Sequence, residues 1–195
     1  MLPIDLPLKS KTPPDWVRHP LADFDLFLLD HASCERKAAA LAMSLISKYA
    51  DKKALIEPMV CLAREELEHF HDVWRIISRR GIPINPHDEK DKYVTTIMSG
   101  LRHGREERFL DQLITSALIE ARGYERFSIL SEALEDQELK LFYKHLSERE
   151  AGHYMIFIRV ARQYFSEAEI AQRLEDISQL ETKAMLETPF SWRLH

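Results

Sequence analysis

The sequence predicts an all-α protein built around a four-helix bundle, and three observations support this fold class. Ala, Leu, Glu, Arg and Lys are plentiful, while only five of the 195 residues are glycine, a composition that favours helix over sheet. Apolar residues recur with helical periodicity along four long segments, and no segment shows a strand pattern. The connections between these segments are short except for one, so that one long crossover joins two helical hairpins.

The first hairpin follows an irregular N-terminal arm over residues 1–20, where five prolines disfavour helix. The first long helix is predicted over residues 21–49 and the second over residues 52–80. A Gly-Ile-Pro stop signal at residues 81–83 ends the second helix. Pro58 lies in the first two turns of the second helix, so the start of this helix is placed at residue 52 or near Glu57.

The second hairpin lies beyond a crossover in which residues 84–92 are expected to form a loop and residues 93–101 a short helix. Two long helices follow over 105–133 and 136–165, with a very short turn between them. Ser166 and Glu169 have the spacing of a capping box, which opens a final helix to about residue 186. This connectivity is ferritin-like. We expect a single domain over residues 1–195, with an arm (1–20), a four-helix core (21–165) and a C-terminal helix and tail (166–195).

Composition excludes several classes of protein. The formal net charge of −5 gives the chain no global basic footprint for nucleic acid, although a local basic patch remains compatible with it. Cys34 and Cys61 form neither a disulfide framework nor a CxxC metal site. The sequence lacks a signal peptide and any apolar stretch of 18 residues, so we expect a cytoplasmic protein with no transmembrane helix.

Three Glu-x-x-His pairs could each present a carboxylate and an imidazole on one helix face. They are Glu66/His69, Glu68/His71 and Glu150/His153. The first and the third lie on apolar stripes and are predicted to face the core, whereas the second lies among charged residues and is interpreted as solvated surface.

Each inward pair follows a helix that carries one further glutamate on an apolar stripe, Glu35 in the first half and Glu120 in the second. The two halves repeat this pattern at a matched interval, because 84 residues separate Glu66 from Glu150 and also His69 from His153. A repeat of functional positions at one interval is far less expected by chance than a single motif.

The six residues of this repeat are predicted to bind metal. An ionised carboxylate in a protein core costs several kcal/mol unless it is paired or bound to a metal ion. Two divalent cations would balance four carboxylates, and this donor set suits iron or manganese. Di-iron carboxylate bundles use one Glu from each of two helices and one Glu-x-x-His from each of the others. The candidate ligands are Glu35, Glu66, His69, Glu120, Glu150 and His153.

Three segments resemble the tRNA 2-methylthio-N6-isopentenyladenosine hydroxylase family, within the ferritin-like di-iron superfamily. They are residues 30–39 (DHASCERKAA), 64–70 (REELEHF) and 120–127 (EARGYERF). The length of the chain and the proline-rich arm also match. This family consists of non-haem di-iron monooxygenases that hydroxylate the isopentenyl group of a modified adenosine beside the tRNA anticodon.

The resemblance implies roles for the candidate ligands. Glu35 and Glu120 would be terminal ligands, Glu66 and Glu150 would bridge two iron ions, and each histidine would bind one ion. It also implies O2 as a co-substrate and a ferredoxin-type external electron donor, since no flavin or nicotinamide motif is visible in the sequence.

A tRNA partner would need basic and aromatic side chains at the surface. The candidate phosphate contacts are Arg36, Lys37, Arg64, Arg102, His103, Arg105, Arg122 and Arg126, and the candidate stacking residues are Trp16, Trp74 and Tyr93. From the residues alone, charges at these spacings are more typical of a solvated helix face. The resemblance favours tRNA binding for the group, though not for any one residue.

Two other functions remain open from the sequence. An iron-oxidising or peroxide-detoxifying protein of the bacterioferritin or rubrerythrin type would use the same six ligands. A rubrerythrin would normally add a CxxC-bearing iron domain, which this sequence lacks. A metal-free helical interaction module would contain no iron, and it would leave four buried carboxylates without explanation.

Overall fold

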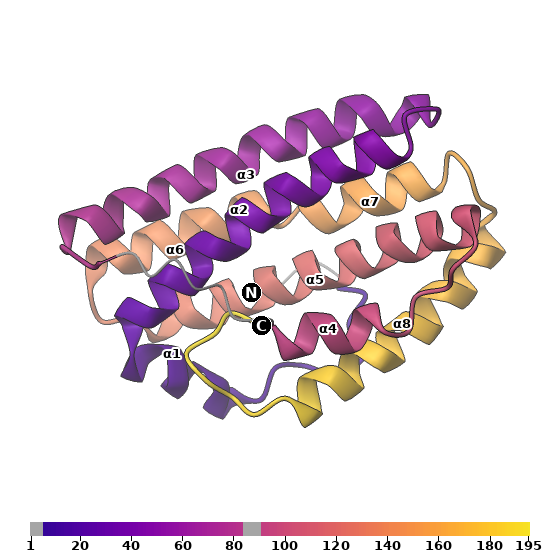
Figure 1. Ribbon diagram of the computed structural model, residues 1–195. Helices are drawn as coiled ribbons and strands as arrows, with labels where there is room; N and C mark the ends of the chain where they lie inside the picture. Colours follow the sequence, from indigo (N-terminus) through magenta and orange to yellow (C-terminus); the bar gives the residue numbers. More distant parts are fainter. Residues whose placement is uncertain (1–5, 84–90) are drawn as a thin grey trace. The chain divides into compact units, whose positions relative to one another are not determined.

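The structure is a computed structural model that describes residues 6–83 and 91–195, and these residues form helices and connections without any strand (Figure 1). The all-α prediction is therefore confirmed. The described residues fall into two compact units. One contains residues 18–83 and 190–194, and the other contains residues 6–17, 91–189 and 195. Each unit is described separately below.

The first unit is a helical hairpin. A short helix α1 (Arg18–Ala22) precedes α2 (Phe24–Lys48), whose N-terminus is capped by the side chain of Asp23. After a short connection the chain reverses into α3 (Lys53–Arg79), which lies along α2 (Figure 1). Helix α3 starts at Lys53 and contains Pro58, so the alternative start near Glu57 is wrong. Only one backbone donor is lost at a proline, and the helix continues past it.

The second unit is built around α5 (Arg105–Ala133), whose bounds agree with the predicted helix. Against α5 pack the 3-10 helix η1 (Pro14–Val17), α6 (Gln137–Glu150), α7 (His153–Ala161) and α8 (Glu167–Glu187). Helix α4 (Lys92–Met98) packs on α8, which confirms the short helix expected in the crossover. Most of the predicted loop at 84–92 lies outside the described residues.

The single helix predicted over residues 136–165 is wrong, because Ala151 and Gly152 divide it into α6 and α7. Glycine is a poor helix former, and it stands here as the N-cap of α7. This interruption falls between Glu150 and His153, two of the candidate metal ligands.

The predicted capping box is confirmed at the start of α8. There the side chain of Glu169 accepts from the backbone amide of Ser166, and the side chain of Ser166 accepts from the backbone amide of Glu169.

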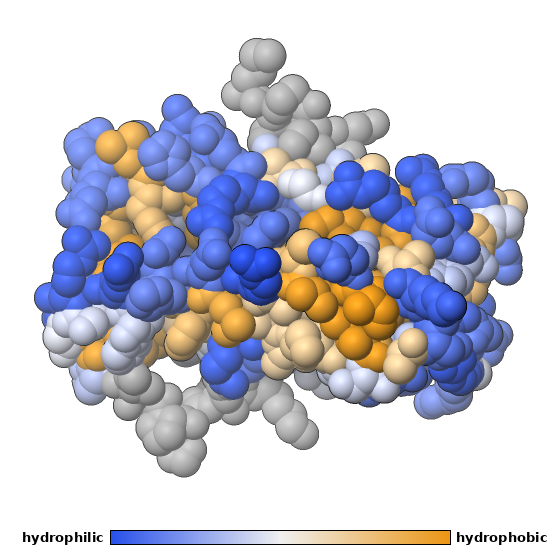
Figure 2. All heavy atoms as spheres, turned by 90° about the horizontal axis from the view of Figure 1, so that it is seen from above, coloured by the Kyte–Doolittle hydropathy of each residue, from blue (hydrophilic) through white to orange (hydrophobic). Residues whose placement is uncertain are grey.

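The surface mixes polar and apolar residues. On the face drawn in Figure 2, hydrophilic residues cover much of the area and hydrophobic residues gather in smaller patches between them. In the part of the chain that the structure describes, no helix is long and apolar enough to cross a membrane.

Candidate metal centre

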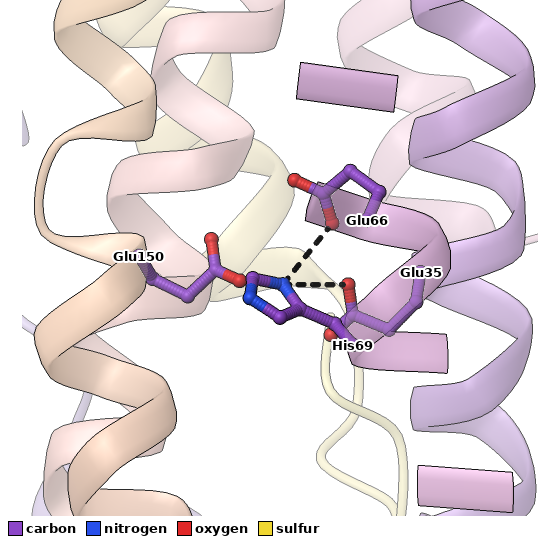
Figure 3. A group of neighbouring side chains, drawn as sticks. All are labelled: Glu35, Glu66, His69 and Glu150. Atoms are coloured by element: carbon purple, nitrogen blue, oxygen red, sulfur yellow. Dashed lines mark ion pairs between the residues drawn. The ribbon is translucent and has the colours of Figure 1, made fainter. Parts of the chain in front are cut away.

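A cluster of two carboxylates and one imidazole lies between α2 and α3. Glu35 comes from α2, and Glu66 and His69 come from successive turns of α3 (Figure 3). The Nδ1 atom of His69 lies 3.6 Å from Oε2 of Glu66 and 3.9 Å from Oε2 of Glu35. All three side chains are buried. Each offers one ligand atom, and these atoms lie within 4.8 Å of one another.

The apolar pattern of the two helices places these side chains in the interior. Residues three apart share a helix face, and the face of α3 that carries Glu66 and His69 also carries buried Leu62 and Val73. Two small buried residues, Ala39 and Ala42, follow Glu35 on α2. The cluster is therefore set in an otherwise apolar core.

The second unit contains a cluster of the same composition. Glu120 comes from α5, Glu150 is the last residue of α6, and His153 is the first residue of α7. The Nδ1 atom of His153 lies 2.7 Å from Oε2 of Glu150 and 4.0 Å from Oε2 of Glu120. Glu150 and His153 are buried, while the side chain of Glu120 is 15% exposed.

Both clusters have a donor set that fits a metal ion. Two atoms that each lie about 2.1 Å from one ion are separated by roughly 3 to 4 Å, which is the spacing around His69. A separation of 3.6 Å or more is too long for a hydrogen bond, so hydrogen bonding does not account for that arrangement. Two carboxylates with one imidazole would balance one divalent cation, and oxygen with imidazole nitrogen suits iron or manganese.

His31 belongs to the surroundings of the first cluster, and the sequence analysis did not select it. Its Nε2 atom lies 2.6 Å from Oε1 of Glu35, and its side chain is fully buried. His31 precedes Glu35 by four residues on α2, a spacing that brings two side chains of a helix together. That spacing is the signal that could have identified it.

The third Glu-x-x-His pair is exposed, which confirms its interpretation as surface: both Glu68 and His71 lie on the outer side of α3.

Of the candidate tRNA contacts, five are exposed and one, Arg102, is half-buried. The five exposed side chains are Arg36, Lys37, Arg64, His103 and Arg105. Their position is compatible with phosphate binding but does not test it.

Two of the candidate tRNA contacts, Arg122 and Arg126, are buried inside the second unit, so neither side chain can meet a phosphate group at the surface. The guanidinium of Arg122 donates to Glu181 at 2.8 and 3.0 Å and to Glu125 at 2.5 Å. Burial alone would lower the pKa of Arg122, but the carboxylate of Glu181 raises it above its ordinary value. Burial lowers the pKa of Arg126 to about 10.

The aromatic candidates for base stacking are also mostly internal. Trp16 packs under the guanidinium of Arg126, 4.9 Å from it. Tyr93 is buried and donates a hydrogen bond to Glu181 at 2.8 Å. Both are therefore unavailable for stacking on a base, and of the three aromatic candidates Trp74 alone keeps partial exposure.

Comparison with known proteins places the chain in a family. A family model described as tRNA-(MS[2]IO[6]A)-hydroxylase (MiaE) matches residues 1–195. The chain belongs to this family. A relative in Pseudomonas putida, named tRNA 2-(methylsulfanyl)-N(6)-isopentenyladenosine(37) hydroxylase, is 38% identical over 192 residues, covering 98% of this chain and 93% of the relative. A protein of the same name in Salmonella typhimurium is 29% identical over 238 residues, covering 96% of this chain and 87% of the relative.

A solved structure also resembles this member of the MiaE family. It is described as Protein 43 with aldehyde deformylating oxygenase activity from Synechococcus. The two chains are 35% identical, with a TM-score of 0.90 over 96% of this chain and 94% of the other. The neighbour has a ferritin-like di-iron fold, which confirms the fold class predicted for this sequence.

Proposed function

We propose that this protein is an O2-dependent non-haem di-iron monooxygenase that hydroxylates the isopentenyl group of 2-methylthio-N6-isopentenyladenosine beside the anticodon of tRNA. The observation that carries the proposal is the presence of two matched carboxylate–imidazole clusters in a chain of the tRNA hydroxylase family. The substrate comes from the names of the relatives. Since tRNA is the substrate, the cytoplasm is the expected location.

The metal ligands in this proposal are the six residues of the internal repeat. Glu35, Glu66 and His69 would hold one iron ion, and Glu120, Glu150 and His153 would hold the other. The family resemblance implies that Glu66 and Glu150 would bridge the two ions. Iron held by these residues would supply the activation of O2 that oxidation of an unactivated carbon requires.

The protein's own residues have three tasks in such a reaction. The carboxylates and imidazoles fix the ions, while the apolar helix faces around them exclude water. The exposed basic side chains on the hairpin of α2 and α3, Arg36, Lys37 and Arg64, are candidates for phosphate contacts. A ferredoxin-type protein is the proposed source of the two electrons.

The ligand assignment predicts about two iron ions per chain and their loss on substitution. Glu66→Ala or Glu150→Ala removes a carboxylate from a buried cluster, so most of the metal should be lost. Metal content is measured by elemental analysis of protein reconstituted with iron. Glu68→Ala is the matched control, because Glu68 lies on the same helix in an exposed Glu-x-x-His pair. Normal metal content in the Glu66 or Glu150 variant would refute the assignment.

The substrate assignment predicts oxygen insertion into a modified nucleoside. Iron-loaded protein, a chemical reductant and O2 are incubated with tRNA that carries the isopentenyl modification, and the nucleosides are analysed by mass spectrometry. The expected product contains one added oxygen atom, with Glu66→Ala as the inactive control. No added oxygen in a reduced and iron-loaded sample would contradict a tRNA hydroxylase.

Gel filtration of the same preparation tests the storage-protein alternative, because a storage cage of the bacterioferritin type would elute at a much larger size than a single chain.

The structural neighbour supports a second candidate function. Its description includes aldehyde deformylating oxygenase activity, and it resembles this chain over nearly the full length. An aldehyde incubated with the iron-loaded protein, O2 and an excess of reductant would then lose its formyl group as formate and yield a hydrocarbon shorter by one carbon. Hydrocarbon formation without any change in the tRNA nucleoside would favour this second function over the first.

A further inference from the structure

We propose that the two metal positions are unequal, and that His31 is the positioning residue that makes the first one the tighter. The α2/α3 cluster is preorganised for an ion, whereas the cluster of α5, α6 and α7 has its ligands on both sides of a helix break. This inference rests on the metal-binding part of the proposed function and goes beyond it, since the ligand set alone is the same in both clusters.

His31 fixes the carboxylate of Glu35 from the side away from the cluster. A carboxylate accepts hydrogen bonds, so Nε2 of His31 is the donor to Oε1 of Glu35 over 2.6 Å. The other oxygen, Oε2, is then directed toward His69. The ring of His31 is itself held in place, because it packs 5.9 Å from the ring of Phe27 at an angle of 34°. Glu35 is thereby oriented to bind an ion through one oxygen.

The other two ligands of this cluster stand on an uninterrupted helix. Helix α3 runs from Lys53 to Arg79, so Glu66 and His69 keep regular helical spacing. Their ligand atoms are 3.6 Å apart, within the range that two atoms on one ion require. Little movement is needed when the ion binds, and preorganised ligands bind more tightly.

The second cluster differs at each of these points. The residue four positions before Glu120 is Ser116, whose side chain is too short to replace the imidazole of His31. The side chain of Glu120 is 15% exposed, against 6% for that of Glu35. Glu150 and His153 lie on opposite sides of the helix break, and their nearest atoms are 2.7 Å apart. Their separation is therefore not set by one regular helix, as that of Glu66 and His69 is.

Anaerobic titration of the metal-free protein with Co²⁺, followed by visible absorption and calorimetry, tests the inference. Two binding steps of different affinity are expected. Glu35→Gln should abolish the tighter step and Glu120→Gln the weaker one, which assigns each step to a cluster. Two equal steps, or the reverse assignment, would overturn the inference while leaving the proposed function intact. A protein that binds no Co²⁺ would overturn both.

Substitution of His31 separates positioning from general packing. His31→Leu should weaken the tighter step by about 10- to 100-fold, as expected for loss of a group that orients a ligand, and should shift its absorption bands. His31→Gln, which can still donate to Glu35, should restore most of the affinity. Ser116→Ala is the matched control and should leave the tighter step unchanged. Equal weakening of both steps in His31→Leu, or no rescue by Gln, would contradict the role of His31.

Discussion

Arg122 shows how a charged side chain can be stabilised inside a helical unit. Its guanidinium donates to the carboxylates of Glu125 and Glu181, to the hydroxyl of Thr12 and to the carbonyl of Ser10. Because these acceptors surround the whole guanidinium group, they offset the cost of its removal from water. Arg122 thus joins α5, α8 and the N-terminal segment of the unit through its hydrogen bonds.

Loss of this guanidinium should be strongly destabilising. Arg122→Ala leaves two buried carboxylates without their cation, and the free energy of unfolding should fall by about 3–5 kcal/mol. The measurement is urea denaturation followed by circular dichroism. Arg36→Ala, at an exposed position of α2, is the control and should change the free energy of unfolding by about 0.5 kcal/mol or less. Similar stability of the two variants would show that the buried network contributes little.

The sequence could not separate Arg122 and Arg126 from surface arginines for a physical reason. Both stand on a helix rich in charged residues, and a guanidinium normally remains in water. The partners that bury Arg122, Thr12 and Glu181, come from segments far away in the chain. Periodicity within one helix contains no information about such partners, whereas it does predict which single glutamates face an apolar core.

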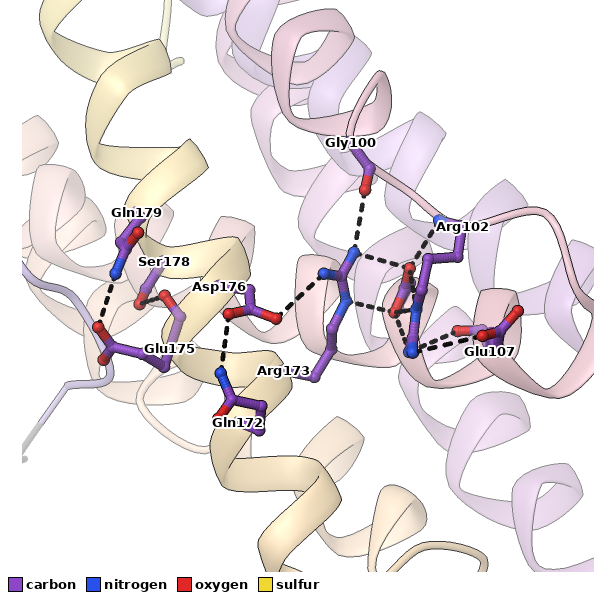
Figure 4. A network of polar contacts seen from close by, with 10 residues as sticks. Gly100, Arg102, Glu107, Gln172, Arg173, Glu175, Asp176, Ser178 and Gln179 are labelled. Carbon is purple, nitrogen blue, oxygen red and sulfur yellow. Dashed lines mark hydrogen bonds and ion pairs between the residues drawn. The ribbon is translucent and has the colours of Figure 1, made fainter.

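At the scale of elements, Asp111 connects three segments of the second unit. Its carboxylate accepts hydrogen bonds from Arg102, just before α5, at 2.7 Å and from Arg173 of α8 at 2.6 Å. Arg173 also donates to the carbonyl of Gly100 (Figure 4). Burial alone would raise the pKa of Asp111, but the hydrogen bonds from the two arginines outweigh it and lower the pKa below its ordinary value.

This lowered pKa predicts how stability depends on pH. In the unfolded chain Asp111 takes up its proton at a higher pH than in the folded one, so its contribution is present above the unfolded pKa of about 3.9. The contribution is lost as the pH falls through the folded pKa. Asp111→Asn should lower the free energy of unfolding by about 2 kcal/mol at pH 7 and reduce its decrease toward pH 3.

Urea denaturation at a series of pH values between 7 and 3 provides the measurement. Asp72→Asn serves as the control, because Asp72 belongs to an exposed ion pair with Arg75 at 3.8 Å. A pH dependence of Asp111→Asn that matches that of the unmodified protein would contradict the argument.

The division of α6 from α7 was the main element that the sequence did not reveal. Apolar residues keep helical spacing on both sides of the junction, from Tyr143 and Leu146 to Phe157 and Val160. A single glycine within such a pattern is often tolerated in a continuous helix. The interruption lies in the backbone hydrogen bonds, where Met155 donates to the carbonyl of Gly152 three residues earlier, and the spacing of apolar residues does not record this.

At the scale of the whole molecule, the repeat of ligand positions predicted more than any single motif. The two halves of the chain carry a glutamate followed by a Glu-x-x-His pair, and the structure shows a cluster of this composition in each unit. The all-α class, the bounds of α5 and the ferritin-like fold are confirmed. The assignment of tRNA contacts to single arginines stays a prediction, since binding to an external partner leaves no periodic pattern within a helix.

The buried network around Arg122 has a consequence for synthesis of the protein on the ribosome. Thr12 joins the network through Glu125 and Arg122, while His195 stacks on Tyr93 with ring centroids 5.5 Å apart, and Tyr93 bonds Glu181 of the same network. Segments far apart in the chain thus meet in one unit. The bond between Arg122 and Glu181 can form only after residue 181 has left the exit tunnel, so a nascent chain that stalls earlier leaves the guanidinium without one of its two carboxylates.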